Sequence, residues 1–225
     1  MRISHSYKFL YLAVPRTGST SVRDALDPIS DIQSVHKPLV RDDHPYYHHI
    51  PYAELVPVFS QNGWNIEEYY SFGVVRNPFD RVVSLYHHYR EKGGRWAEGK
   101  SIAYNLARSA RLRLLPTDSF DRFVEKLNPT TAMQMSASRF FSDADGDFCV
   151  NAVLKFEKVA GDYAAIAKQL EFPAQQCELP RLNQSINRED YRKYYSNARL
   201  VDHVASVYSD DIDRFGYSFD PVDKE

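Results

Sequence analysis

A short loop of small and hydroxyl-bearing residues follows the first apolar stretch of the chain. Residues 14–21 read VPRTGSTS and lie between a predicted strand and a predicted helix. Such a junction points backbone N–H groups and the positive end of a helix dipole at one spot, and a glycine lets a phosphate approach the backbone closely. An anion-binding loop is therefore predicted, with an ordinary capped helix as the alternative. The residues expected to bind the anion are Arg16, Thr17, Gly18, Ser19, Thr20 and Ser21.

This loop lacks two residues of the motif that binds nucleoside triphosphates. That motif is GxxxxGK[ST], and both its first glycine and its lysine are missing here. Hydrolysis of ATP or GTP is therefore disfavoured.

A second polar motif, VVRNPFDRVVSLY over residues 74–86, follows another apolar stretch. Arg76 ends the predicted strand, and Ser84 lies about two turns along the helix that Asn77 and Pro78 would open. Proteins with parallel sheets bind their ligands at the carboxyl ends of the strands. Both motifs would meet at that edge of the sheet. A guanidinium with a hydroxyl suits a terminal phosphate, so Arg76 and Ser84 are predicted to bind one. The alternative for Arg76 is a surface ion pair with Asp80, worth about 0–1 kcal/mol if exposed.

Several of the eight histidines lie between the two motifs, and histidine is the natural general base near neutral pH. His36 would end a short strand on the ligand side of the sheet. His44 and His48 have the spacing of two metal ligands on one helix, but Pro45 separates them and no third ligand is evident, so no metal is expected. For any one histidine, a structural or solvent-facing role is the alternative.

The elements that would position these residues alternate between strands and helices. A sheet of that kind is expected to be parallel and covered by helices on both faces. Ser19 or Thr20 is expected to cap the first helix. The predicted strands span residues 8–14, 32–36, 69–75 and 150–156, and the predicted helices span residues 19–27, 52–60, 78–90, 102–115, 120–127, 163–170 and 189–208.

The chain has 225 residues, a length typical of one compact domain, which we expect to span residues 1–225. Hydrophobic residues make up 43%, too many for a disordered chain, and the net charge of −2 gives no field that attracts nucleic acid or an anionic membrane. Two cysteines favour a reducing compartment, and the apolar residues 9–14 are too few for a membrane span. We expect a cytoplasmic protein with no nucleic-acid partner.

The two motifs together resemble those of the sulfotransferases that use 3'-phosphoadenosine 5'-phosphosulfate (PAPS), particularly the carbohydrate sulfotransferase type. Both are present in the family's order. FEKVAGDY, LNQS and the terminal DIDRFGYSF resemble the family more loosely, so the resemblance touches most of the chain. It implies a three-layer α/β fold, with a mostly parallel sheet flanked by helices as in P-loop NTPases.

The resemblance also implies roles for the candidate residues. The loop from Arg16 to Ser21 would hold the 5'-phosphosulfate, and Arg76 with Ser84 would hold the 3'-phosphate. Asn183 and Ser185 would close over the nucleotide, with an ordinary polar loop as the alternative. The position of His49 resembles that of the family's catalytic histidine best, and His36 comes second.

Arg16 departs from the family pattern, which commonly has lysine at this position. Arginine supplies the charge but cannot act as a proton donor, because its pKa is above about 12, so the phosphate would leave through electrostatic stabilisation. The expected reaction is in-line transfer of a sulfuryl group to a hydroxyl, with a carbohydrate as acceptor. The alternatives are a catalytically inactive nucleotide-binding or regulatory protein on the same fold, and a small-molecule or nucleotide kinase.

Two further groups bear on the acceptor. Lys100, Arg108, Arg111 and Arg113 would put positive charge on a predicted helix and attract an acidic sugar polymer, or would form a solvated face. Tyr46, Tyr47 and Tyr52 would stack on a sugar ring, or would pack in the core.

Overall fold

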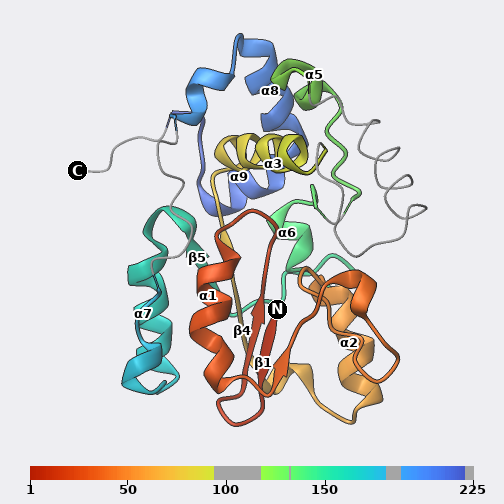
Figure 1. Cartoon of the computed structure of the whole chain (residues 1–225), viewed down its shortest axis with the longest axis vertical. Helices are drawn as coiled ribbons and strands as arrows, with labels where there is room; N and C mark the ends of the chain where they lie inside the picture. The colour runs from red at the N-terminus through yellow and green to blue at the C-terminus, as the bar shows by residue number, and fades with distance from the viewer. Residues whose placement is uncertain (94–117, 132, 181–188, 221–225) are drawn as a thin grey trace. The chain divides into compact units, whose positions relative to one another are not determined.

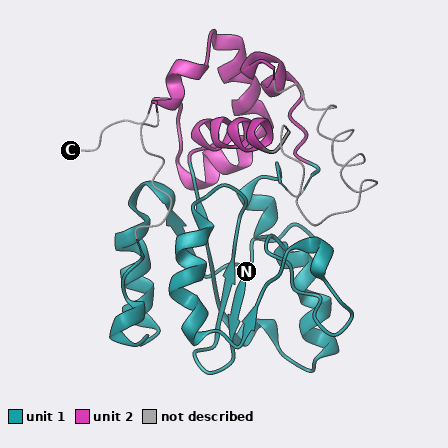
Figure 2. Cartoon of the chain, viewed as in Figure 1, with its two compact units in different colours: residues 1–76, 130–186 teal, residues 77–129, 187–225 magenta. Residues whose placement is uncertain are grey.

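The computed structural model describes residues 1–93, 118–131, 133–180 and 189–220 (Figure 1). The predicted helix over residues 102–115, with Lys100, Arg108, Arg111 and Arg113, lies outside the described residues, as do Asn183 and Ser185. The chain divides into two compact units, the first of residues 1–76 and 130–186 and the second of residues 77–129 and 187–225 (Figure 2). A single domain over residues 1–225 stays a prediction.

The first unit is built on a five-stranded sheet with the strand order β3-β1-β2-β4-β5. The pairs β2–β4 and β4–β5 are parallel, whereas β1 is antiparallel to both β2 and β3. The expectation of a mostly parallel sheet is therefore wrong, because the sheet is mixed. Its strands are β1 (Arg2–Ser4), β2 (Phe9–Leu12), β3 (Ile32–Gln33), β4 (Tyr70–Val75) and β5 (Ala152–Lys155).

The antiparallel part comes from a hairpin at the start of the chain. Residues 5–8 form a turn, and strand β1 pairs Ile3 with Leu10 of β2. The turn sequence HSYK contains no glycine, asparagine or proline to mark it, and Lys8 takes the left-handed conformation with φ 48°. Strand β1 is only three residues long, so no periodic pattern indicates it.

Helices flank the sheet, as predicted. The helices of this unit are α1 (Ser19–Leu26), α2 (Tyr52–Gln61), α6 (Ala137–Phe140) and α7 (Val159–Gln169). Figure 1 shows α1 and α7 on one side of the strands and α2 on the other. Short 3-10 helices are η1 (Asp27–Ile29), η2 (Lys37–Leu39), η3 (Ile66–Glu68), η4 (Phe156–Lys158) and η5 (Ala174–Gln176).

One hydrophobic core joins β2, β4 and β5 to α1 and α7. It forms because alternate residues of each strand point to the same face, where they meet the apolar stripes of the two helices. On strand β4, a side chain at Gly73 would collide with Phe141, since a Cβ there would lie 2.4 Å from the ring. The main core residues are Phe9, Tyr11, Val22, Leu26, Phe72, Val74, Leu154, Tyr163 and Ile166.

The second unit is helical in the part of it that the structure describes. Its elements are α3 (Pro78–Gly93), α5 (Phe120–Glu125), η6 (Tyr191–Tyr194), α8 (Ala198–Val207) and α9 (Ser209–Phe215). Aromatic rings fill its interior, with Tyr86 against Phe120 and Phe79 against Tyr195. The single helix predicted over residues 189–208 is instead η6 followed by α8. The Asn197 side chain accepts a hydrogen bond from the Leu200 N–H and thereby starts a new helix there.

Candidate functional site

The anion-binding loop predicted at residues 14–21 connects β2 to α1. Arg16 and Gly18 both have left-handed backbone conformations, with φ of 66° and 75°. Gly18 is the N-cap of α1, so neither Ser19 nor Thr20 caps the helix as expected. The Thr17 hydroxyl is buried and donates to the Val14 carbonyl at 3.0 Å. A loop fixed in this way ahead of a helix N-terminus can present several N–H groups to an anion.

Arg76 joins the two motifs within the first unit. It follows β4 directly, and its Nη1 atom donates to the Arg16 carbonyl at 2.9 Å. Only 6% of Arg76 is exposed, so the alternative of an exposed surface ion pair does not apply. The guanidinium carbon lies 4.4 Å from the centroid of the Phe156 ring. The second motif therefore supports the backbone of the first.

His49 contacts the residue that precedes the same loop. Its Nδ1 atom is 2.7 Å from the carbonyl oxygen of Ala13, the residue after β2. A carbonyl oxygen can only accept, so Nδ1 carries the hydrogen and Nε2 of the neutral ring carries the lone pair. That tautomer is the one that can take a proton through Nε2.

The other candidate base, His36, is exposed and is the N-cap of η2. Its ring centroid lies 4.4 Å from that of His48, which in turn lies 6.4 Å from that of His49. Nδ1 of His48 forms a 2.9 Å hydrogen bond with the Ser34 hydroxyl. Burial, and next the charge of Arg23, lower the pKa of His48 to about 3. His48 is therefore neutral near pH 7.

Ser84 belongs to the second unit, on α3, and is buried. Tyr46, Tyr47 and Tyr52 are 5–7% exposed, so they pack in the interior and do not offer open faces for stacking.

No group of three or more His, Cys, Asp and Glu side chains that could hold a metal occurs among the described residues. His44 instead forms a 3.0 Å hydrogen bond through Nε2 with the Gln33 carbonyl. Within the same described ranges, no helix combines the length and the apolar character that crossing a membrane requires.

Phe156 is a residue of this region that was not predicted as a site residue, although it begins the segment FEKVAGDY. It follows β5 as Arg76 follows β4, and β4 and β5 are parallel. Its place at the end of the strand predicted over residues 150–156 was the signal that could have found it, since parallel sheets bind their ligands at the carboxyl ends of the strands.

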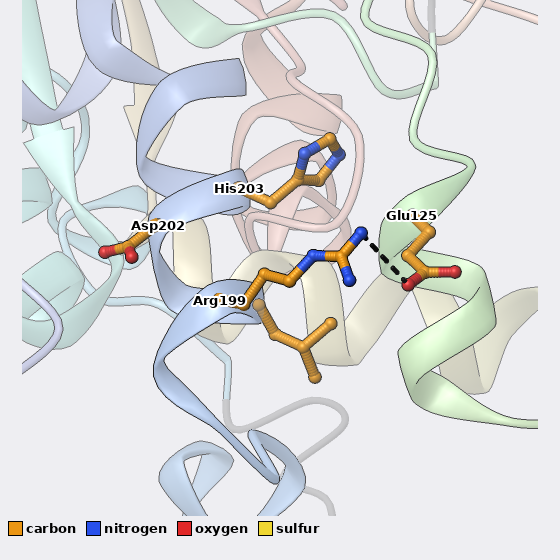
Figure 3. A pocket seen from close by; sticks show the side chains of 5 residues that line it. Glu125, Arg199, Asp202 and His203 are labelled. Carbon is orange, nitrogen blue, oxygen red and sulfur yellow. Dashed lines mark ion pairs between the residues drawn. The ribbon is translucent and has the colours of Figure 1, made fainter.

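The second unit has a separate surface pocket of about 500 Å³ (Figure 3). Figure 3 shows Arg199 of α8 pointing toward Glu125 at the end of α5, and the two side chains form an ion pair at 4.0 Å. Leu200, Asp202 and His203 of α8 complete the lining. The pocket contains none of the motif residues, and we assign it no ligand.

Comparison with known proteins agrees with the two motifs. A model of the sulfotransferase family matches residues 1–218. No curated protein and no solved structure gives a significant match to the chain. The match spans both motifs and both compact units. The chain therefore belongs to the sulfotransferase family of transferase enzymes.

Proposed function

We propose that this sulfotransferase takes its sulfuryl group from PAPS and transfers it to a hydroxyl group of a carbohydrate acceptor. The observation that carries the proposal is the hydrogen bond between His49 and the Ala13 carbonyl. It supports a general base at the start of the anion-binding loop, with the lone pair on Nε2. PAPS and the carbohydrate acceptor rest on the resemblance of the motifs to those of PAPS-dependent enzymes. A cytoplasmic location stays a prediction from the cysteine content.

The donor would be held by the two motifs. The 5'-phosphosulfate would be bound by Arg16 and by the N–H and hydroxyl groups of Thr17, Gly18, Ser19, Thr20 and Ser21. Arg76 and Ser84 would bind the 3'-phosphate, and Asn183 and Ser185 would contact the nucleotide. The burial of Arg76 supports its proposed role in binding the 3'-phosphate. Its guanidinium is held by a carbonyl and a ring, so it is already oriented before the ligand arrives.

The reaction would be an in-line displacement at sulfur. His49 accepts the acceptor's hydroxyl proton on Nε2 as that oxygen bonds to sulfur. The bond from sulfur to the bridging oxygen breaks, and its electron pair leaves with the nucleotide 5'-phosphate. Arg16 and the loop N–H groups stabilise the negative charge on that phosphate. His36 is the second candidate for the base, and no metal ion is expected to take part.

Donor binding is tested by calorimetric titration with 3'-phosphoadenosine 5'-phosphate (PAP), beside ATP and adenosine 5'-phosphosulfate. We expect a Kd of about 1 μM or lower that depends on the 3'-phosphate. Arg76→Lys keeps the charge but loses the planar fork, so it should weaken PAP binding at least about tenfold. Arg139→Lys, at an exposed position of α6, is the matched control and should bind normally. Equal affinity for PAP and ATP would contradict the donor assignment and favour a kinase.

The base is tested by His49→Asn, whose amide can still donate to the Ala13 carbonyl but cannot take a proton. Turnover of labelled PAPS, with an acceptor found by screening, should fall by about a hundredfold or more while PAP affinity stays unchanged. His44→Asn is the control and should keep full turnover. If His49→Asn stays within a few-fold of the unsubstituted chain while His36→Asn is inactive, His36 is the base. PAP binding without transfer to any acceptor would instead support an inactive nucleotide-binding protein.

A further inference from the structure

Phe156 contacts both phosphate motifs from the position directly after β5. Its ring lies beneath the Arg76 guanidinium, with 4.4 Å between the guanidinium carbon and the ring centroid. The same ring fills the space that a side chain at Gly18 would need, since a Cβ there would lie 2.7 Å from Cε2 of Phe156. One aromatic side chain therefore adjoins the cation of one motif and the backbone of the other.

These contacts connect the loop, Arg76 and the ring within the first unit. Arg76 donates to the carbonyl of Arg16, which has the left-handed φ of 66°. Gly18, two residues later, packs against Phe156. A shift of the ring would therefore move the guanidinium and would remove a contact that holds the Gly18 backbone. The loop and the guanidinium depend on the same side chain for their position.

The aromatic character of this side chain matters as well as its size. The electron-rich face of a ring attracts a guanidinium placed over it. A leucine at position 156 would fill part of the volume but would offer no such face. A tyrosine would keep the face.

We propose that Phe156 is a positioning residue of the donor site, which holds the Arg76 guanidinium and the Gly18 backbone in the arrangement that binds the nucleotide. The inference rests on the proposed function, because Phe156 would set the affinity for the PAPS nucleotide. It assigns a role to a residue outside both phosphate motifs.

The test is PAP titration and donor kinetics of Phe156→Leu and Phe156→Tyr. We expect Phe156→Leu to raise the Kd for PAP and the KM for PAPS by about tenfold, with the KM for the acceptor unchanged. Phe156→Tyr should keep both the Kd for PAP and the KM for PAPS within about threefold of the values of the unsubstituted chain. Phe148→Leu is the matched control, because Phe148 is also partly buried in the first unit but contacts Phe141 instead. It should bind PAP normally.

A second measurement follows Arg76 without any nucleotide. The Nε–Hε resonance of Arg76 should show a ring-current shift that Phe156→Leu removes and Phe156→Tyr keeps. An unmoved resonance, or PAP binding by Phe156→Leu within twofold of the unsubstituted chain, would overturn the inference alone. Failure of the unsubstituted chain to bind PAP would overturn the proposed function itself, and the two failures are thus distinguishable.

Discussion

At the residue scale, the anion-binding loop depends on a backbone conformation that most side chains disfavour. Gly18 has φ 75° and ψ 17°, in the left-handed region, and it is the N-cap of α1. A side chain there would meet two penalties, because the conformation costs about 1–3 kcal/mol for most residues and the Phe156 ring occupies the space. Glycine at this position is therefore required by the geometry of the loop.

We therefore predict that Gly18→Ala lowers the free energy of unfolding by about 1–3 kcal/mol and weakens PAP binding by tenfold or more. Urea denaturation and calorimetry measure the two effects. Gly161→Ala is the matched control, because Gly161 lies in α7 with open space where a Cβ would be. This variant should be slightly more stable than the unsubstituted chain. If Gly18→Ala behaves like Gly161→Ala, the loop does not need the left-handed conformation.

Much of the candidate site could be predicted from local sequence, because Arg76 directly follows a recognisable strand and Arg16 lies in the loop after another. The contacts between them could not. The Arg76 hydrogen bond to Arg16 joins residues 60 positions apart, and the His49 bond to Ala13 joins residues 36 positions apart. Both use a main-chain carbonyl, which every residue has, so no residue type signals them. The role of Phe156 is hidden for a similar reason, because it depends on which strand lies next to β4.

At the element scale, the sequence predicts best where local chemistry starts or ends an element. Helix α3 begins at Pro78 as expected, because the Asn77 side chain accepts from the Phe79 N–H at 3.1 Å and proline is favoured in the first turn. Strands β4 and β5 are confirmed, although β5 is shorter than predicted. Apolar runs bounded by polar residues mark both.

The sheet's mixed character was less predictable, because it depends on pairing between segments. Strand β1 has three residues, too few for a pattern, and β3 covers only residues 32–33 of the strand predicted over residues 32–36. Strand β1 pairs Ile3 with Ile32 of β3, and Arg2 of β1 also forms an ion pair with Asp27 after α1. The carboxyl ends of β2 and β4 still open at the same edge, since these two strands are parallel. The correction therefore leaves the placement of the two motifs unchanged.

At the scale of the whole molecule, the charge balance is near neutral, so local burial of ionisable groups matters more than the overall field. His48 is the clearest case. Its ring lies against His36, its Nδ1 hydrogen-bonds to Ser34, and burial with the nearby Arg23 charge keeps its pKa near 3. In an unfolded chain the same imidazole would have a pKa of about 6.5.

Between those two pKa values the unfolded chain binds more protons than the folded chain. The contribution of His48 to stability is therefore fully present above about pH 6.5 and is lost progressively as the pH falls toward 3. We predict that His48→Asn, which keeps a hydrogen-bonding group near Ser34 but cannot ionise, makes stability less sensitive to acid. Between pH 6.5 and 4.5 the proton uptake on unfolding should fall by up to about one proton.

Urea denaturation of both chains at several pH values, followed by circular dichroism, measures this uptake as the slope of unfolding free energy against pH. The difference between the chains at pH 8, where the ring is neutral in both the folded and the unfolded state, gives the cost of the substitution apart from ionisation. Subtracting it isolates the proton-linked part. Parallel slopes for the two chains would show that His48 titrates normally in the folded protein, and acid sensitivity would then have to arise at other buried groups.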